Sequence, residues 1–183
     1  MITFDKRLLQ RVRIPLGFLY AAIFLIFSRP TALWLAVGAA ISLVGLAIRA
    51  WASGHIRKGE ELAVSGPYAF TRNPLYFGSF VMGAGFTLAS GVWWLAVLFC
   101  ILFLGIYFPV MRVEIGEIRE KYGADLDEYE RNVPLFFPRL TVWKRTGKRF
   151  DFQLYLRYRE YRAALGVASA LAVLAFKAYF FNW

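Results

Sequence analysis

Two polar stretches, each flanked by apolar segments, carry the side chains that could do chemistry. In the first, Arg72 precedes Asn73-Pro74, and this dipeptide predicts a helix start because Asn caps helices well and Pro suits the first turn. Arg72 would then lie beside a helix N-terminus, where exposed backbone N–H groups and the helix dipole favour an anion. Alternatively, Arg72 reaches phospholipid phosphate and the nearby tyrosines form an interfacial aromatic belt. The spacing alone does not decide between these interpretations.

The second polar stretch places a carboxylate where a helix leaves its apolar part. Ile115, Ile118 and Tyr122 recur at helical spacing, so we expect the preceding apolar helix to continue until Gly123 ends it. Glu114 is then the first acidic residue beyond the apolar part. At this position, the boundary between bilayer and cytoplasm, a polar ligand that enters from the cytoplasm would meet a lipid substrate. The alternative is an ordinary solvated charge at a helix exit.

Five apolar segments must position these residues. Hydrophobic residues make up 59% of the 183 residues, above the usual share of about 45–50% in soluble domains. Backbone groups in hydrocarbon must be bonded internally, which favours helices. We therefore expect an all-α, polytopic membrane helical bundle of about five transmembrane helices, in one domain over residues 1–183. The segments are 14–28, 31–48, 75–89, 92–110 and 163–183, and the first and third are shorter than the ~20 residues of a typical crossing.

The distribution of charge predicts the orientation of this bundle. If all five segments cross, 20 of the 22 Lys and Arg residues lie on one side, and only Arg29 and Lys177 lie on the other. Because positive loops face the cytoplasm, we expect a protein of the cytoplasmic (inner) membrane with its N-terminus and both polar stretches inside. No acidic residue falls in the bilayer core, which argues against a transporter. Topology and anionic lipid headgroups account for the net charge of +10, so no nucleic-acid partner is expected.

The chain has few residues for nucleophilic or metal chemistry. Its single cysteine, Cys100, lies within the fourth apolar segment, and its single histidine, His55, follows the second. These two side chains cannot easily form a nucleophile and base pair. A zinc site needs about four His, Cys or carboxylate ligands, so no metal is expected.

Several short motifs follow one another across the two polar stretches. They are Gly66-Pro67-Tyr68, Arg72-Asn73-Pro74-Leu75-Tyr76, Gly78, Glu114, Tyr122-Gly123, Tyr129, Val133-Pro134, Phe136 and Pro138. Their order and separation resemble the isoprenylcysteine carboxyl methyltransferase and phospholipid methyltransferase superfamily. In that family the pattern is G-x-Y, R-H-P-x-Y-x-G, E-E, F-G, Y-x-x-Y and V-P-x-F-x-P. The resemblance covers residues 49–138, about half of the chain.

The resemblance implies a membrane enzyme that binds S-adenosylmethionine in a cytoplasm-facing pocket beneath its C-terminal segment. The expected acceptor is a membrane-embedded, lipid-like molecule, prenylcysteine-like or a phospholipid, methylated on a carboxyl or polar head group. Membrane lipids are further expected partners. Arg72, Asn73 and Arg112 are the residues expected to take part in catalysis. By position, the expected cofactor contacts are Glu61, Leu62, Tyr68, Asn73, Pro74, Tyr76 and Glu114.

The sequence departs from the family pattern at several positions. Asn73 replaces the usual histidine, which keeps a hydrogen-bonding group but removes titration near neutral pH. Ile115 replaces the second acid of the E-E pair. Val110 stands where the eukaryotic enzymes have a substrate-linked arginine, and Arg112 is a candidate replacement. These changes leave cofactor binding as the expectation and weaken the case for a prenylcysteine carboxyl acceptor.

Methyl transfer depends largely on alignment of the reactants and exclusion of water. A carboxylate is already nucleophilic, whereas a protonated amine first needs a base. With His55 as the only imidazole, we favour an oxygen or an already deprotonated acceptor. The competing interpretation is a non-enzymatic membrane scaffold or lipid-binding protein that keeps the fold.

The basic and aromatic stretch 140–162 precedes the last apolar segment. Within it, Tyr155, Tyr158 and Tyr161 repeat every three residues. This spacing predicts an interfacial helix that leads into the last segment. A lid over the site is the alternative.

Overall fold

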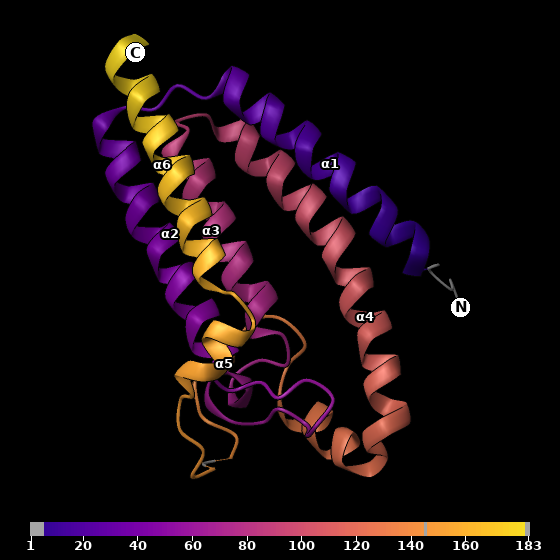
Figure 1. Ribbon diagram of the computed structural model, residues 1–183. Helices are drawn as coiled ribbons and strands as arrows, with labels where there is room; N and C mark the ends of the chain where they lie inside the picture. Colours follow the sequence, from indigo (N-terminus) through magenta and orange to yellow (C-terminus); the bar gives the residue numbers. More distant parts are fainter. Residues whose placement is uncertain (1–5, 145, 182–183) are drawn as a thin grey trace.

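The computed structural model describes residues 6–144 and 146–181, and within them the chain forms helices and no strand (Figure 1). The prediction of an all-α bundle is confirmed, and all five apolar segments are helical. The last is described as far as Phe181, so Trp183 lies outside the described residues. The elements are α1 (Lys6–Phe27), α2 (Ala32–Ser53), η1 (Gly66–Ala69, a 3-10 turn), α3 (Pro74–Ala89), α4 (Trp93–Asn132), α5 (Phe152–Arg157) and α6 (Tyr161–Phe181).

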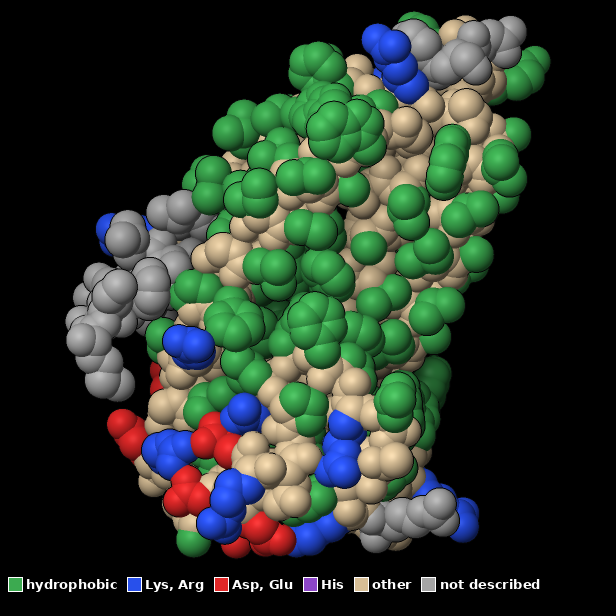
Figure 2. Space-filling view, turned by 180° about the vertical axis from the view of Figure 1, so that it is seen from behind, with side chains coloured by type: hydrophobic (Ala, Val, Ile, Leu, Met, Phe, Trp, Pro, Cys, Tyr) green, Lys and Arg blue, Asp and Glu red, His purple; other side chains and the backbone are tan. Residues whose placement is uncertain are grey.

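Three of these helices, α2, α4 and α6, are long and apolar enough to cross a bilayer. The apolar part of α1, Ile14–Phe27, and the whole of α3 are shorter apolar helices. Large apolar side chains face outward: Phe18, Trp93 and Tyr179 are 74%, 78% and 78% exposed. Figure 2 shows hydrophobic side chains over most of one face, with most charged side chains gathered at one end and a small basic group at the other. Such a surface suits lipid rather than water, so the chain is an integral membrane protein.

Helices α2 and α3 pack closely because small residues line their contact. A Cβ atom added at Gly38 of α2 would lie 2.4 Å from the carbonyl oxygen of Gly85. One added at Gly45 would lie 2.4 Å from the backbone nitrogen of Met82. Small residues stabilise helix pairs in lipid because they let two backbones approach each other. This tight pair supports the first turn of α3, where the first polar stretch ends.

The remaining helices complete two sides of the bundle (Figure 1). Helix α6 packs on α2, and α1 packs on α4. In Figure 1, α4 starts beside α3 at the α3–α4 turn and diverges from α2 and α3 as it runs to the end that carries the loops. At the opposite end, Lys177 donates hydrogen bonds to the carbonyl of Leu25 at 2.5 Å and to the hydroxyl of Ser28 at 3.2 Å. These bonds tie α6 to the end of α1.

Gly123 ends the straight part of α4, as predicted. Its φ of 44° and ψ of −116° are non-helical, a conformation that glycine tolerates and other residues avoid. The sequence did not predict that the chain then continues as a further helix to Asn132. On this returning segment, Leu126, Tyr129 and Val133 are at most 3% exposed and form a core at the loop end of the bundle.

The second apolar segment is longer than its predicted range of 31–48, because α2 continues to Ser53. This extension makes Arg49 part of the helix. Arg49 donates a hydrogen bond from Nη2 to the Glu160 carboxylate at 2.7 Å and another from Nη1 to the Ser79 hydroxyl at 2.5 Å. A partly buried charge is tolerated when it is paired in this way.

The prediction of one interfacial helix across Tyr155, Tyr158 and Tyr161 is wrong, because the chain is not continuously helical there. Helix α5 ends at Arg157, Tyr158 caps it, and α6 begins only at Tyr161. Arg159 between them has a positive φ of 56°. The break brings the Glu160 carboxylate to Arg49, and this ion pair gives a physical reason for interrupting the helix.

The charge distribution yields a testable topology. A reporter fused at residue 140 is expected to be cytoplasmic, and one placed after Trp183 is expected to lie outside. The reason is that, if all five apolar helices cross, 20 of the 22 Lys and Arg residues fall on one side, which favours retention of that side in the cytoplasm. Reporter activity in whole cells measures both positions. A cytoplasmic reporter after Trp183 would make α6 a re-entrant or surface helix.

Candidate functional site

The first turn of α3 meets α4 at two residues that the sequence analysis singled out. The Tyr76 hydroxyl donates a hydrogen bond to Oε1 of Glu114 at 2.8 Å, although the two residues are 38 positions apart. The Tyr76 ring also packs against Tyr107, with ring centroids 5.3 Å apart. Because Tyr107 precedes Glu114 by two helical turns, both side chains lie on the same face of α4. The fold thus gathers two aromatic rings around one carboxylate.

The turn before α3 is held in place by the segment that follows α4. The backbone N–H of Arg72 donates to the Pro134 carbonyl at 2.9 Å. The backbone N–H of Arg139 donates to the Phe70 carbonyl, also at 2.9 Å. The two motif-bearing stretches are therefore bonded to each other, and the return of the chain after Gly123 is needed to position the start of α3.

Asn73 and Pro74 begin α3 as predicted, with Pro74 in the first turn. The expected side-chain cap is absent, because Nδ2 of Asn73 donates instead to the Leu135 carbonyl at 3.0 Å. The backbone of Asn73, with φ −127° and ψ 58°, lies outside the extended conformation from which an N-cap side chain reaches its helix. Asn73 thus fastens the turn to the segment after α4.

Arg72 is turned inward and paired. Its Nη1 forms an ion pair with Glu130, and the two side chains are 15% and 21% exposed. Glu130 also pairs with Arg119, which binds Asp127 as well; the hydrogen bond to Asp127 raises the pKa of Arg119. The Nε–H of Arg72 is buried and has no partner within the part of the chain that the structure describes. The structure thus pairs the Arg72 guanidinium within the loop end, and its part in ligand binding stays a prediction.

Two tyrosine hydroxyls, of Tyr68 and Tyr122, are also buried without a partner among the described residues. Tyr68 is 5% exposed, and its carbonyl accepts a hydrogen bond from the Tyr129 hydroxyl at 2.7 Å. Burial raises the pKa of the Tyr68 hydroxyl, so this group stays protonated and can donate at neutral pH. Buried polar groups normally have partners. Each of these hydroxyls and the Arg72 N–H thus lacks a partner among the described residues, and none of them lines the two cavities described below.

Glu61 and Leu62, two expected cofactor contacts, have different surroundings. Leu62 packs on the Leu126 core beneath α4. The Glu61 carboxylate pairs with Lys148 and faces Arg57 at 3.8 Å. It lines a separate cavity whose walls include neither the start of α3 nor any residue of α4. The structure therefore brings Leu62, but not the Glu61 carboxylate, to the core that supports the site.

Arg112 lies apart from the Tyr76–Glu114 pair. It is exposed, and its guanidinium carbon lies 5.0 Å from the centroid of the Phe108 ring. Residues two positions apart on a helix do not face each other, so Arg112 points to another side of α4 than Glu114. No contact between Arg112 and the Tyr76–Glu114 pair is seen among the described residues, so its role in catalysis stays a prediction.

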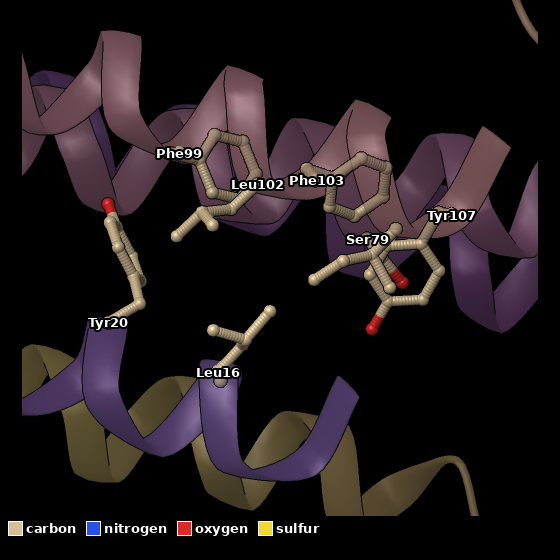
Figure 3. Close-up of a pocket in the computed structure, with 9 residues that line it drawn as sticks. Leu16, Tyr20, Ser79, Phe99, Leu102, Phe103 and Tyr107 are labelled. Atoms are coloured by element: carbon tan, nitrogen blue, oxygen red, sulfur yellow. The ribbon is translucent and has the colours of Figure 1, made fainter. Parts of the chain in front are cut away.

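An apolar groove with a volume of about 240 Å³ leads to this cluster from the membrane-spanning helices. Leu16 and Tyr20 of α1 lie across the groove from the α4 side chains Phe99, Leu102 and Phe103 (Figure 3). At one end lies Tyr107, the residue that packs against Tyr76 (Figure 3). The groove thus extends along lipid-facing helices as far as Tyr107, the neighbour of Tyr76.

Sequence reasoning missed three residues of this site. Tyr107 could have been found, because it precedes Glu114 by seven residues and so shares its helix face. Tyr122 was used only as part of a helical pattern and a motif. Glu130 gave no signal, because its pairing with Arg72 depends on the return of the chain after Gly123.

The fold and the site define an all-helical integral membrane protein with a polar, partly buried site at one end and an apolar approach to it. A family profile described as phospholipid methyltransferase matches residues 32–125. The chain belongs to this family of membrane methyltransferases, within the superfamily that its motifs resemble.

Two curated relatives have names that refer to metals. The chain is 33% identical over 110 residues to the nickel-cobalt-cadmium resistance protein NccN of Alcaligenes xylosoxydans xylosoxydans, covering 59% of this chain and 50% of that protein. It is 29% identical over 144 residues to the cobalt-zinc-cadmium resistance protein CzcN of Cupriavidus metallidurans, covering 72% of this chain and 64% of that protein. The chain thus spans half to two thirds of these relatives. No solved structure matches the chain significantly.

Proposed function

We propose that this protein transfers a methyl group from S-adenosylmethionine to the polar end of a membrane-embedded, lipid-like acceptor. The observation that carries the proposal is the position of the Tyr76–Glu114 pair between the apolar groove and the charged loop end. A water-soluble cofactor and a lipid acceptor can meet only at such a boundary. The cofactor, when bound, supplies an electrophilic methyl group on a sulfonium centre.

The residues present fit this cofactor, which carries an amine, a carboxylate and hydroxyl groups. Glu114 offers acceptor oxygens, and Tyr76 holds that carboxylate in one orientation by its hydrogen bond of 2.8 Å. The Tyr68 hydroxyl and the Arg72 Nε–H offer buried donors without other partners among the described residues. Asn73, with the Pro74 that follows it, keeps the turn beneath them fixed.

The groove fits the hydrocarbon part of the acceptor. Its walls are mainly aromatic and aliphatic side chains of α1 and α4, with Ser79 of α3, and such walls exclude water and favour an alkyl chain. A chain that lies there would present its polar end beside Tyr107, next to Tyr76. Alignment of the acceptor atom and exclusion of water are the two contributions that methyl transfer most needs.

Labelling of membrane lipids tests the proposal. Membranes from cells that make the protein are incubated with methyl-labelled S-adenosylmethionine and extracted with organic solvent. Wild type and Glu117→Gln are expected to label a lipid, and Glu114→Gln is expected to label much less of it. If no lipid is labelled and the purified protein does not bind the cofactor at millimolar concentration, the non-enzymatic scaffold is the better description.

Asn73→His tests the turn. The variant is expected to keep or raise cofactor affinity, because an imidazole N–H can replace the bond to the Leu135 carbonyl and the family pattern has His here. Asn73→Leu removes the donor, so it should lower the free energy of unfolding by about 1 kcal/mol. Calorimetric titration and thermal unfolding of detergent-purified proteins measure these effects. If Asn73→His loses cofactor binding while wild type keeps it, the alignment of this turn with the motif is wrong.

The names of the two relatives favour a second candidate function, in resistance to divalent metals. Growth of a host on nickel, cobalt or cadmium, with the wild-type chain and with Glu114→Gln, separates two routes. Tolerance that disappears in Glu114→Gln depends on methyl transfer. Tolerance that both proteins support equally belongs to a non-enzymatic function of the same fold.

A further inference from the structure

A second cavity lies at the loop end, between the end of α2 and the segment before α5. Its volume is about 280 Å³, near the lower end of the range for small-molecule sites. Unlike the groove between the membrane helices, this cavity is lined by several charged and polar side chains besides Gly54 and Leu154. The polar side chains are His55, Arg57, Glu61, Ser65, Lys148 and Arg149.

Positive charge is in excess around this cavity. Lys148 pairs with Glu61, and Arg57 pairs with Asp151 at 3.1 Å. Arg149 is exposed and forms no ion pair with any residue that the structure describes. Two carboxylates thus orient Lys148 and Arg57 at the wall, while the charge of Arg149 is left uncompensated.

Two further polar side chains are fixed in the cavity wall. The His55 ring is held from behind, because its Nδ1 lies 2.9 Å from the Trp51 carbonyl oxygen. Its other side packs on Gly66, where an added Cβ atom would lie 2.7 Å from Nε2. Ser65 is 2% exposed and lines the cavity, and its side chain makes no capping hydrogen bond to η1. A hydroxyl donor is therefore available beside the cations.

The surroundings of the cavity are those of a membrane interface. Phe150 packs against Gly54 in the cavity wall. Phe150, Phe152 and Leu156 are 45%, 60% and 47% exposed, directly before or within α5. Exposed aromatic and aliphatic side chains next to a basic site are typical of the headgroup level of a bilayer.

We propose that this cavity binds a phosphate group. Guanidinium and ammonium groups form strong, charge-assisted hydrogen bonds with phosphate oxygens, and the Ser65 hydroxyl adds a neutral donor. The phosphate can belong to the headgroup of an anionic phospholipid or to a soluble compound, and both share the same chemistry. The site is separate from the Tyr76–Glu114 pair, so the proposal holds whether or not the protein transfers methyl groups.

The test compares Arg149→Gln with Arg131→Gln in the full-length, detergent-purified protein. Arg131 is an exposed arginine in the last turn of α4 that does not line the cavity, so it controls for general surface charge. Short-chain phosphatidic acid, the matching diacylglycerol and inorganic phosphate are titrated by calorimetry. We expect wild type to bind phosphatidic acid, Arg149→Gln to bind it about tenfold more weakly, and Arg131→Gln to stay within about twofold of wild type.

The outcomes separate the two sources of phosphate. Displacement of phosphatidic acid by inorganic phosphate would assign a soluble ligand, and lack of displacement would assign a lipid headgroup; both support a phosphate site. Three results would overturn it: no binding of either phosphate compound, equal binding of diacylglycerol, or equal losses in the two arginine variants. Because Arg149 is exposed and has no ion pair with a described residue, the first variant is expected to fold, and its thermal unfolding midpoint checks this.

Discussion

Glu114→Gln is expected to weaken S-adenosylmethionine binding by about 10- to 150-fold, which corresponds to the loss of about 1.5 to 3 kcal/mol from hydrogen bonds to a charged group. The amide keeps one oxygen that can accept the hydrogen bond from Tyr76, so the variant should fold. It loses the negative charge that would attract the cofactor amine. The effect on binding should therefore exceed the effect on stability, which we expect to stay below about 0.5 kcal/mol.

Glu117→Gln is the matched control for this prediction. Glu117 lies one turn further along α4 and is exposed, so its replacement should leave cofactor affinity within about twofold. Calorimetric titration of the three detergent-purified proteins measures the difference. Equal affinities in wild type and both variants would show that Glu114 is a solvated charge at a helix exit. The strongest link between this site and methyl transfer would then be lost.

The helices were predictable because each is encoded locally. The apolar runs, the Asn73-Pro74 start of α3 and the stop at Gly123 all depend on residues within one or two turns. Where the prediction was wrong, a distant partner decided the outcome. Arg49 stays in α2 because Glu160, 111 positions later, neutralises it, and the same contact interrupts the helix predicted across Tyr158.

The site was predictable only in part for the same reason. The pairing of Tyr76 with Glu114 agrees with the motif positions, although neither residue alone indicates the contact. The Glu61 carboxylate and Arg112 lie away from this pair, which motif positions could not indicate because side-chain direction on the loop and on α4 depends on packing; their roles stay predictions. The groove gave no sequence signal at all. Its walls come mainly from α1 and α4, which are separated by two helices in the chain, with Ser79 of α3.

Gly17→Phe is expected to lower the rate of methyl transfer to the lipid acceptor at least about tenfold while leaving cofactor affinity unchanged. Gly17 lines the groove, and a Cβ atom added there would meet no other atom within 4 Å. The first carbon of the new side chain therefore meets no clash, and we expect its ring to occupy the space proposed for the acceptor chain. If it displaces only two methylene groups, at about 0.8 kcal/mol each, acceptor binding already falls more than tenfold.

Gly166→Phe provides the matched control on α6, since a Cβ atom at Gly166 also meets nothing within 4 Å and the residue lies outside the groove. Initial rates of label transfer to the lipid identified in membranes, at low acceptor concentration, measure the effect. Both variants add the same ring to a lipid-facing helix, so a general effect on insertion or folding would lower both rates. A fall in Gly17→Phe alone, with unchanged calorimetric binding of the cofactor, would locate the acceptor between α1 and α4. Equal rates in wild type and both variants would mean that the acceptor reaches Tyr76 and Glu114 by another route.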